Sequence, residues 1–209
     1  GLFGKIKKEK FTINNKVVIL KYDKELNKIA NYFVKILENL DNEENAIKEN
    51  HTIRIGYMLY KVEVDNNDYK ILTIDINNNN LDSFTDDLSN AFNYFQRQTG
   101  IINQTKISSN LVIDTYFDED MIISKKSLNN KKLYMLREEK NGNDCGWYLG
   151  VIGEEKTNNP NDYVKIKTYR LKDICDVAID VLQLPVGTLV IIDNNKIIDI
   201  VDKNNNKLI

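Results

Sequence analysis

The sequence is poor in the residues that most often carry chemistry or covalent cross-links. Its 209 residues include one histidine, two cysteines, two prolines and nine glycines. A single histidine, His51, cannot make a zinc site of the usual kinds without several cysteine or acidic partners. Cys145 and Cys175 lie thirty residues apart without a CxxC pair, so no disulfide framework is expected. We therefore expect no metal and no other cofactor.

A surplus of charge and a long apolar run are also missing. The formal net charge is -2, and the one basic run, residues 5–10, contains Glu9. Nucleic-acid binders usually carry a basic surplus or stripe, so we expect no nucleic-acid partner. No apolar run approaches the ~18 residues of a membrane span, and the first ten residues lack the apolar core of a signal peptide. These features favour a cytoplasmic protein that is a monomer or a weak dimer.

Known catalytic motifs are absent as well. The sequence has no Walker A loop, no dinucleotide-binding glycine pattern and no GxSxG elbow. Cys145 lies between Asp144 and Gly146, and a neighbouring acid disfavours the thiolate that a nucleophile needs. We expect no enzyme, and the alternative that remains is an unfamiliar enzyme that uses the Asp144-Cys145 loop together with Glu154.

Hydrophobic periodicity predicts an α+β protein built from two mostly antiparallel sheet units, each with helices packed on one face. In the first part, residues 16–22 are a strand, and the spacing of apolar residues over 26–40 predicts a helix capped by Asp23. Residues 53–64 and 69–76 read as a hairpin. A second helix follows, capped by Asp82 or Ser83, with Phe84 on its apolar face and Gly100 as its stop signal. A strand at 111–116 completes a β-α-β-β-α-β domain, which we place at residues 1–117.

The second domain is placed at residues 118–209, after the acidic triplet Asp118, Glu119 and Asp120. Alternating segments predict strands at 121–124, 132–137, 147–152 and 163–168. A short amphipathic helix begins near Leu171 and ends at Pro185, and a final hairpin turns at Asn194-Asn195.

Several short segments of the second domain follow one another in the order of a known pattern. They are Ser124-Lys125, Arg137-Glu138-Glu139, Asp144 with Gly146-Trp147, Gly153-Glu154-Glu155 and Leu184-Pro185-Val186-Gly187-Thr188. In this order they resemble the C-terminal domain of a bacterial immunity family of polymorphic-toxin systems, immunity protein family thirty-three, first catalogued as a domain of unknown function. The resemblance covers about 85 residues of the C-terminal part. Cys145 stands where that family usually has serine, and residues 148–152 differ from its more aromatic stretch.

The residues of this motif have structural interpretations of their own. Gly146 suits a backbone conformation that other residues avoid, and Asp144 can brace its loop through the carboxylate. Arg137 can pair with Asp144 or Glu138 across adjacent strands. Trp147 is expected to be a core anchor. The family motif residues are therefore either structural or partner-binding: Arg137, Glu138, Asp144, Gly146, Trp147, Gly153 and Glu154.

The resemblance implies a non-enzymatic immunity protein that binds and neutralises a cognate protein toxin. Acidic groups would speed association if that toxin were a basic nuclease. The acidic residues that we predict as partner-binding are Asp82, Asp86 and Asp87, on the second helix, and Asp118, Glu119 and Asp120. The alternative is a scaffold or adaptor protein unrelated to toxins.

Overall fold

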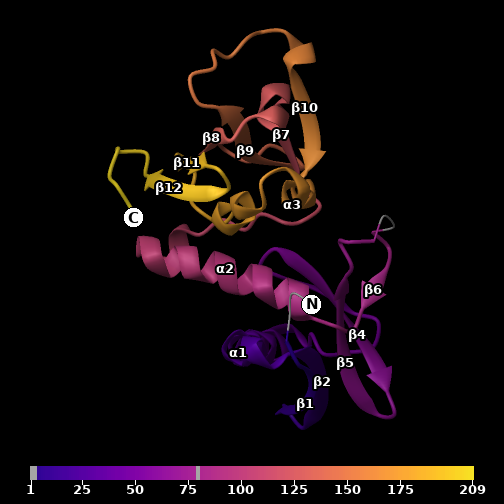
Figure 1. Cartoon of the computed structure of the whole chain (residues 1–209). Coiled ribbons are helices and arrows are strands. Elements are labelled where there is room, and N and C mark those ends of the chain that lie inside the picture. The colour runs from indigo at the N-terminus through magenta and orange to yellow at the C-terminus, as the bar shows by residue number, and fades with distance from the viewer. Residues whose placement is uncertain (1–3, 79–80) are drawn as a thin grey trace. The chain divides into compact units, whose positions relative to one another are not determined.

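The structure, a computed structural model, describes residues 4–78 and 81–209 (Figure 1). The chain divides into two compact units between Gln96 and Arg97, inside the helix α2 (Ser89–Thr105). Each unit is built on its own mixed sheet, in which one strand pair is parallel and the other pairs are antiparallel. The predicted α+β class is therefore confirmed. The predicted boundary between residues 117 and 118 lies within the second unit and stays a prediction.

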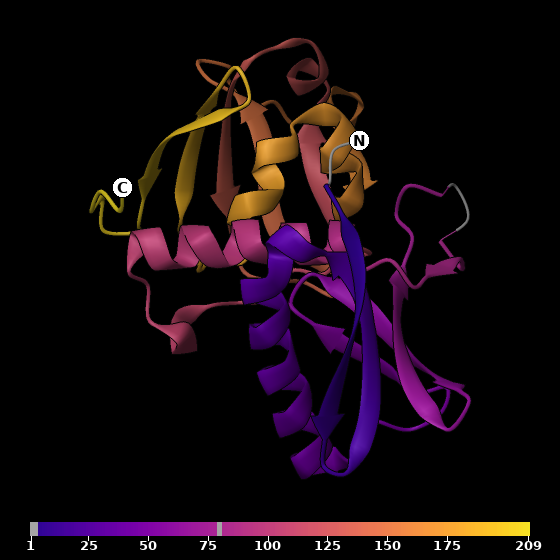
Figure 2. The ribbon, with the colours of Figure 1, turned by 60° about the horizontal axis from the view of Figure 1, so that its bottom comes forward.

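The sheet of the first unit has the strand order β1-β2-β5-β4-β3, with the short β6 paired to β5. Its elements are β1 (Ile6–Ile13), β2 (Lys16–Asp23), the 3-10 turn Lys24–Leu26, α1 (Asn27–Glu44), β3 (Thr52–Ile55), β4 (Met58–Asp65), β5 (Asp68–Ile74) and β6 (Phe84–Thr85). Figure 2 shows α1 running beside the β1–β2 hairpin. The buried ring of Phe33 in α1 packs against Tyr60 of β4 at 4.8 Å and Phe92 of α2 at 5.0 Å. Aromatic packing therefore anchors α1 and the start of α2 to the core of this unit.

The strand β1 was not predicted, because its lysines read as a basic run. Its partner across the turn is β2, and every residue from Ile6 to Ile13 pairs with one of β2. The turn between them is Asn14-Asn15, with both φ angles positive, at 49° and 65°. Asparagine tolerates this conformation, which tight two-residue hairpins require. The asparagine pair was thus the signal for a hairpin that the sequence analysis missed.

The second helix starts later and ends later than predicted. Residues 84–85 form the strand β6, and α2 begins at Ser89 after Asp87, whose carboxylate accepts hydrogen bonds from the Ser89 amide (3.0 Å) and hydroxyl (2.7 Å). The helix also continues through Gly100 to Thr105, since a helix interior tolerates a glycine at a cost of about 1 kcal/mol. Asp82, Asp86 and Asp87 therefore precede the helix, and their predicted place on it was wrong.

The sheet of the second unit has the strand order β10-β7-β9-β8-β11-β12. Its elements are the 3-10 turn Ser109–Leu111, β7 (Asp120–Ser124), the 3-10 helix Lys125–Asn129, β8 (Lys132–Arg137), β9 (Asp144–Val151), the 3-10 turn Pro160–Asp162, β10 (Tyr163–Lys167), the 3-10 turn Thr168–Arg170, α3 (Leu171–Ile174), the 3-10 helix η6 (Asp176–Val181), β11 (Leu189–Asp193) and β12 (Lys196–Val201). Figure 2 shows its short helices in front of the strands. The indole nitrogen of the buried Trp147 in β9 donates to the Leu182 carbonyl, which follows η6, at 2.9 Å. This side of the sheet therefore faces the helices and forms the core of the unit.

The predicted strand at residues 111–116 does not form. The segment is instead hydrogen-bonded to Gln183. The side chain of Gln183 accepts a hydrogen bond from the Thr115 amide (2.5 Å) and donates one to the Thr115 carbonyl (3.2 Å). The Ile113 amide donates to the Gln183 carbonyl at 3.2 Å. Buried backbone groups need partners, and a glutamine supplies them here in place of a strand. In the part of the chain that the structure describes, no helix is long and apolar enough to cross a membrane.

Candidate functional site

Arg137, the last residue of β8, is fully buried and holds several backbone segments together. Its Nη1 donates to the carbonyls of Ile113 (2.8 Å), Leu182 (2.8 Å) and Leu184 (3.0 Å), and its Nε donates to the Cys145 carbonyl at 3.2 Å. Burial lowers the pKa of Arg137, and the carbonyl dipoles offset part of the cost of burying its charge. Its expected ion pair with Asp144 or Glu138 is absent from the described residues. The side chain therefore works as an internal brace.

Trp147 packs beside Arg137 in the same core. The guanidinium lies over the indole ring, 5.6 Å from its centroid, a distance at which a cation and an aromatic face attract each other. Trp147 is 1% exposed and has its N–H bonded. It is therefore out of reach of a partner protein.

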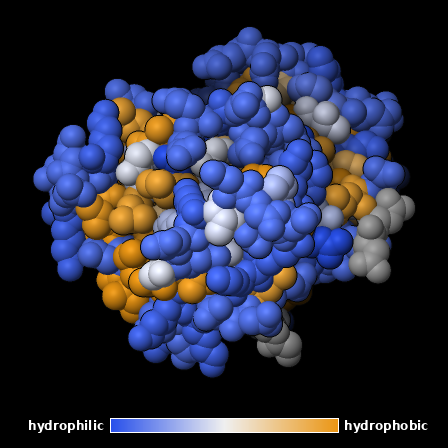
Figure 3. Space-filling view, turned by 90° about the horizontal axis from the view of Figure 1, so that it is seen from above, coloured by the Kyte–Doolittle hydropathy of each residue, from blue (hydrophilic) through white to orange (hydrophobic). Residues whose placement is uncertain are grey.

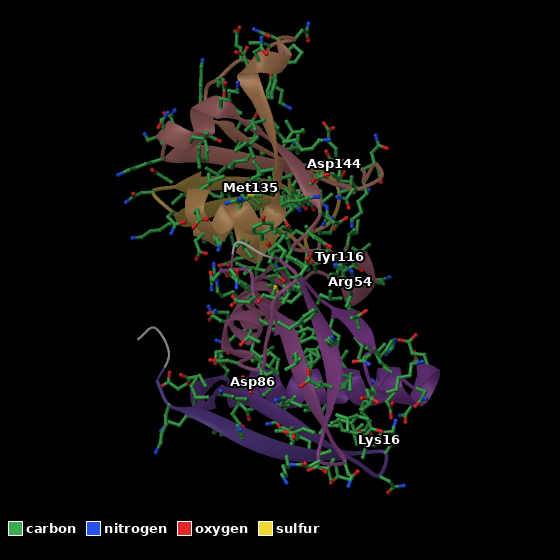
Figure 4. The ribbon with its side chains drawn as sticks, turned by 90° about the vertical axis from the view of Figure 1, so that its right-hand side faces the viewer. Lys16, Arg54, Asp86, Tyr116, Met135 and Asp144 are labelled. Atoms are coloured by element: carbon green, nitrogen blue, oxygen red, sulfur yellow. The ribbon has the colours of Figure 1, made fainter. Side chains whose placement is uncertain are left out.

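The loop before Trp147 depends on Asp144 and Gly146. The Asp144 carboxylate accepts from the Gly146 amide at 2.8 Å. Gly146 has φ +89°, and a Cβ added to it would lie 2.0 Å from the Glu138 carbonyl oxygen. Figure 4 shows Met135 inside the second unit and Asp144 at its border. These contacts give Asp144 and Gly146 a structural role in bringing β9 close to the end of β8.

The remaining motif residues lie at the other end of β9. The Ser124 hydroxyl donates to the Glu154 carboxylate, with its oxygen 2.8 and 2.9 Å from Oε1 and Oε2. Gly153 has φ +83° and open space around it. Asp144-Cys145 and Glu154 are separated by the whole of β9, about 23 Å at the usual rise of a strand. They therefore do not form one catalytic site.

The two thiols are buried, and one nitrogen of the histidine ring is close to a backbone carbonyl. Cys145 and Cys175 are buried, and burial raises the pKa of Cys145 to about 11 and that of Cys175 above its usual value. The His51 ring nitrogen Nδ1 lies 2.6 Å from the Ala46 carbonyl. Among the described residues, no group of three or more His, Cys, Asp or Glu side chains is placed to hold a metal ion.

The acidic triplet that follows the 111–116 segment is largely neutralised by lysines. The buried Glu119 pairs with Lys140 at 2.8 Å, and Asp120 pairs with Lys167 at 2.8 Å. The Lys167 ammonium lowers the pKa of Asp120, so this carboxylate stays charged at neutral pH. Asp118 is half-buried. Two of the three predicted contact residues therefore already have cationic partners.

The acidic residues of the first unit also have interaction partners within the chain. Asp86 pairs with Lys21 at 3.4 Å and with Lys70 at 3.9 Å, and Asp87 holds the start of α2. Asp82 is exposed and interacts with a neighbouring group. Figure 4 shows Asp86 in the first unit and Asp144 in the second. Asp118, Glu119 and Asp120 also belong to the second unit, so the two predicted acidic groups lie in different units.

Three tyrosines of the second unit were not singled out from the sequence. Tyr134, Tyr148 and Tyr163 are half-buried on β8, β9 and β10, and their ring centroids are 5.9 Å apart between the first two and 6.1 Å apart between the last two. A signal was present, because β8 and β9 carry large apolar residues at consecutive positions instead of alternating them with polar ones. Such runs indicate strands with little water on either face.

These features define a class of protein, an α+β scaffold whose motif residues organise a core and whose described part contains no catalytic arrangement that we recognise. The family follows from comparison with known proteins. The model of the Imm33-like domain family matches residues 98–203, slightly more than half of the chain. The chain therefore belongs to the Imm33-like domain family, and the resemblance seen in the sequence is confirmed. The match begins at Gln98 in α2, earlier than the resemblance did. No curated protein and no solved structure matches the chain.

Proposed function

We propose that the protein is a non-enzymatic immunity protein, which binds a cognate protein toxin in the bacterial cytoplasm and neutralises it. The family match over residues 98–203 is the observation that carries this proposal. The structure supports it in a second way. The residues that suggested an enzyme, Asp144, Cys145 and Glu154, are a loop brace, a buried thiol and a carboxylate at the far end of the strand.

The acidic residues predicted from the sequence stay an alternative contact surface, which would suit a toxin with a basic surface. All of them already interact within the chain: Asp82 and Asp118 with neighbouring groups, and Glu119, Asp120 and Asp86 with lysines that they would first have to leave. Breaking an exposed ion pair costs little, at most about 1 kcal/mol, whereas Glu119 is buried and its pair is harder to break.

The proposal is tested with the toxin encoded next to this chain in its genome. Cells that express the toxin alone should die, and cells that also express this chain should grow. The purified pair should form a complex of defined stoichiometry with a nanomolar dissociation constant. The proposal is wrong if the purified proteins do not bind and growth is not restored. Binding without protection would instead favour an adaptor.

A further inference from the structure

The second sheet has a side that faces away from α3 and η6, which we call the open face. Four pairs of opposed residues place large apolar side chains on it: Ile122 and Tyr148, Tyr148 and Leu136, Leu136 and Leu189, Leu189 and Val201. Directly opposed residues of neighbouring strands share a face. They therefore form one apolar band across β7, β9, β8, β11 and β12, and each of them is only half-buried. A sheet face that is exposed only to water usually carries polar side chains, so the apolar band is unusual for such a face.

The tyrosine row, Tyr134, Tyr148 and Tyr163, lies on the same face. Tyr134 is opposite Gly150, and a Cβ on Gly150 would lie 2.8 Å from ring atoms of both Tyr134 and Tyr148. Because Gly150 has no side chain, both tyrosine rings can pack directly against the backbone of the sheet at this point. The pKa of Tyr148 rises to about 12 because its ring is partly desolvated. Rigid tyrosines on an apolar bed are typical of the residues that dominate protein–protein binding.

Six lysines lie in β8 and β10 or in the segments that adjoin β7, β8 and β9, and we call them the lysine rim: Lys125, Lys126, Lys131, Lys132, Lys156 and Lys165. All six are exposed, and none makes an ion pair within the described residues. The Lys156 ammonium lies over the Tyr148 ring, 4.3 Å from its centroid. Of the nearby acids, Glu154 is held by Ser124 and Asp162 by Thr157. On the same face, Asp120 pairs with Lys167 and Asp199 pairs with Lys207. Neither pair uses a rim lysine, so the rim adds cations that outnumber Glu155 and Asp193.

We propose that the open face is the surface on which the Imm33-like unit binds its toxin, and that the toxin presents an acidic surface with an apolar centre to it. This inference rests on the proposed function. The band crosses five strands, about 20 Å at the usual strand spacing, which suits a folded protein better than a small ligand. Figure 3 shows apolar patches among polar groups on one side of the molecule. The unpaired lysines complement carboxylates of the toxin, and the tyrosines fill its apolar centre.

The experiment measures the binding kinetics of the purified full-length chain to the toxin encoded beside it. Tyr134→Ala tests the row, with Tyr32→Ala as its matched control, since Tyr32 is an exposed tyrosine stacked on Phe95 in the first unit. The double variant Lys125→Glu/Lys126→Glu tests the rim. Its control is Lys28→Glu/Lys35→Glu on α1, where both lysines are exposed and unpaired within the described residues. Thermal unfolding of each variant checks that it is folded.

We expect Tyr134→Ala to raise the dissociation constant about 30-fold, mostly through faster dissociation. The rim variant should slow association about 10-fold at low salt, and this effect should shrink at high salt. Both controls should bind like the original chain. If the original chain binds the toxin and both test variants bind it as tightly as the original chain does, the open face is not the docking surface. In that case, a loss of binding in Asp118→Lys would indicate that the acidic residues contact the toxin instead. If the original chain does not bind, the proposed function itself fails, and this inference falls with it.

Discussion

At the scale of single residues, the family motif consists mostly of residues that the structure needs. Gly146 is the sharpest case, because two independent constraints act on it. Its φ of +89° lies in the left-handed region, and the Glu138 carbonyl occupies the place of a side chain. An added Cβ thus meets both backbone strain and a steric clash.

Gly146→Ala should therefore lower the free energy of unfolding by about 3 kcal/mol or more. Gly142→Ala is the matched control, since Gly142 also has a positive φ, +59°, but nothing within 4 Å. Its cost should be limited to backbone strain, about 1 kcal/mol. Urea unfolding of the two variants measures the difference, and equal losses would show that the clash at Gly146 is relieved by movement of the loop.

The two thiols give a second prediction at this scale. Cys145 is 0% exposed and Cys175 is 5% exposed, and burial raises the pKa of both. Neither thiol forms much thiolate at pH 8, and neither is accessible. Alkylation of the native protein with iodoacetamide at this pH should therefore be at least tenfold slower than in denaturant. A thiol labelled rapidly in the folded protein would speak for an enzyme that uses cysteine.

At the scale of elements, Arg137 joins parts of the chain that strand pairing leaves separate. It ends β8, and its guanidinium binds the carbonyls of Ile113, Leu182 and Leu184. Ile113 belongs to the segment where a strand was expected. One buried side chain thus positions both the irregular segment around Ile113 and the chain between η6 and β11. The planar guanidinium of arginine has several N–H donors in fixed directions, which these hydrogen bonds require.

Arg137→Lys should lower the free energy of unfolding by about 3 kcal/mol, because an ammonium cannot reach all of these carbonyls and leaves some unsatisfied. Arg170→Lys serves as the control: Arg170 is exposed, with its guanidinium 5.4 Å from the Tyr169 ring centroid, and its change should stay within about 0.5 kcal/mol. Chemical unfolding provides the measurement. If Arg137→Lys lowers the free energy of unfolding no more than Arg170→Lys does, the hydrogen bonds of the Arg137 guanidinium do not contribute to stability.

At the scale of the whole molecule, the half-buried carboxyl of Asp180 makes stability depend on pH. Asp180 receives a hydrogen bond from Arg97 Nε at 2.7 Å, yet burial raises the pKa of Asp180 to about 6, from 3.8. Between these two values the folded state holds a proton that the unfolded state releases. The contribution of Asp180 to stability is therefore greatest below pH 3.8 and is lost as the pH rises through 6.

Asp180→Asn removes this titration and serves as the reference. The unfolding free energy of the original chain minus that of the variant should fall between pH 4 and pH 7 and level off above it. The change should be at most about 3 kcal/mol. Thermal or urea unfolding over this pH series measures it. A difference that rises with pH would show that Arg97 outweighs burial and lowers the pKa of this carboxyl.

The sequence by itself determined the α+β class, the family, most of the strands and the end of the chain as a hairpin at Asn194-Asn195, whose φ angles are 50° and 58°. These depend on local periodicity and turn chemistry, which neighbouring residues encode. The hairpin that contains β1 also had a local signal, the pair Asn14-Asn15. Only the tertiary structure decided that residues 111–116 are held by Gln183 and that Arg137 points into the core. It also brought the tyrosine row together from three strands. Each of these depends on residues far apart in the chain, so no local pattern could specify them.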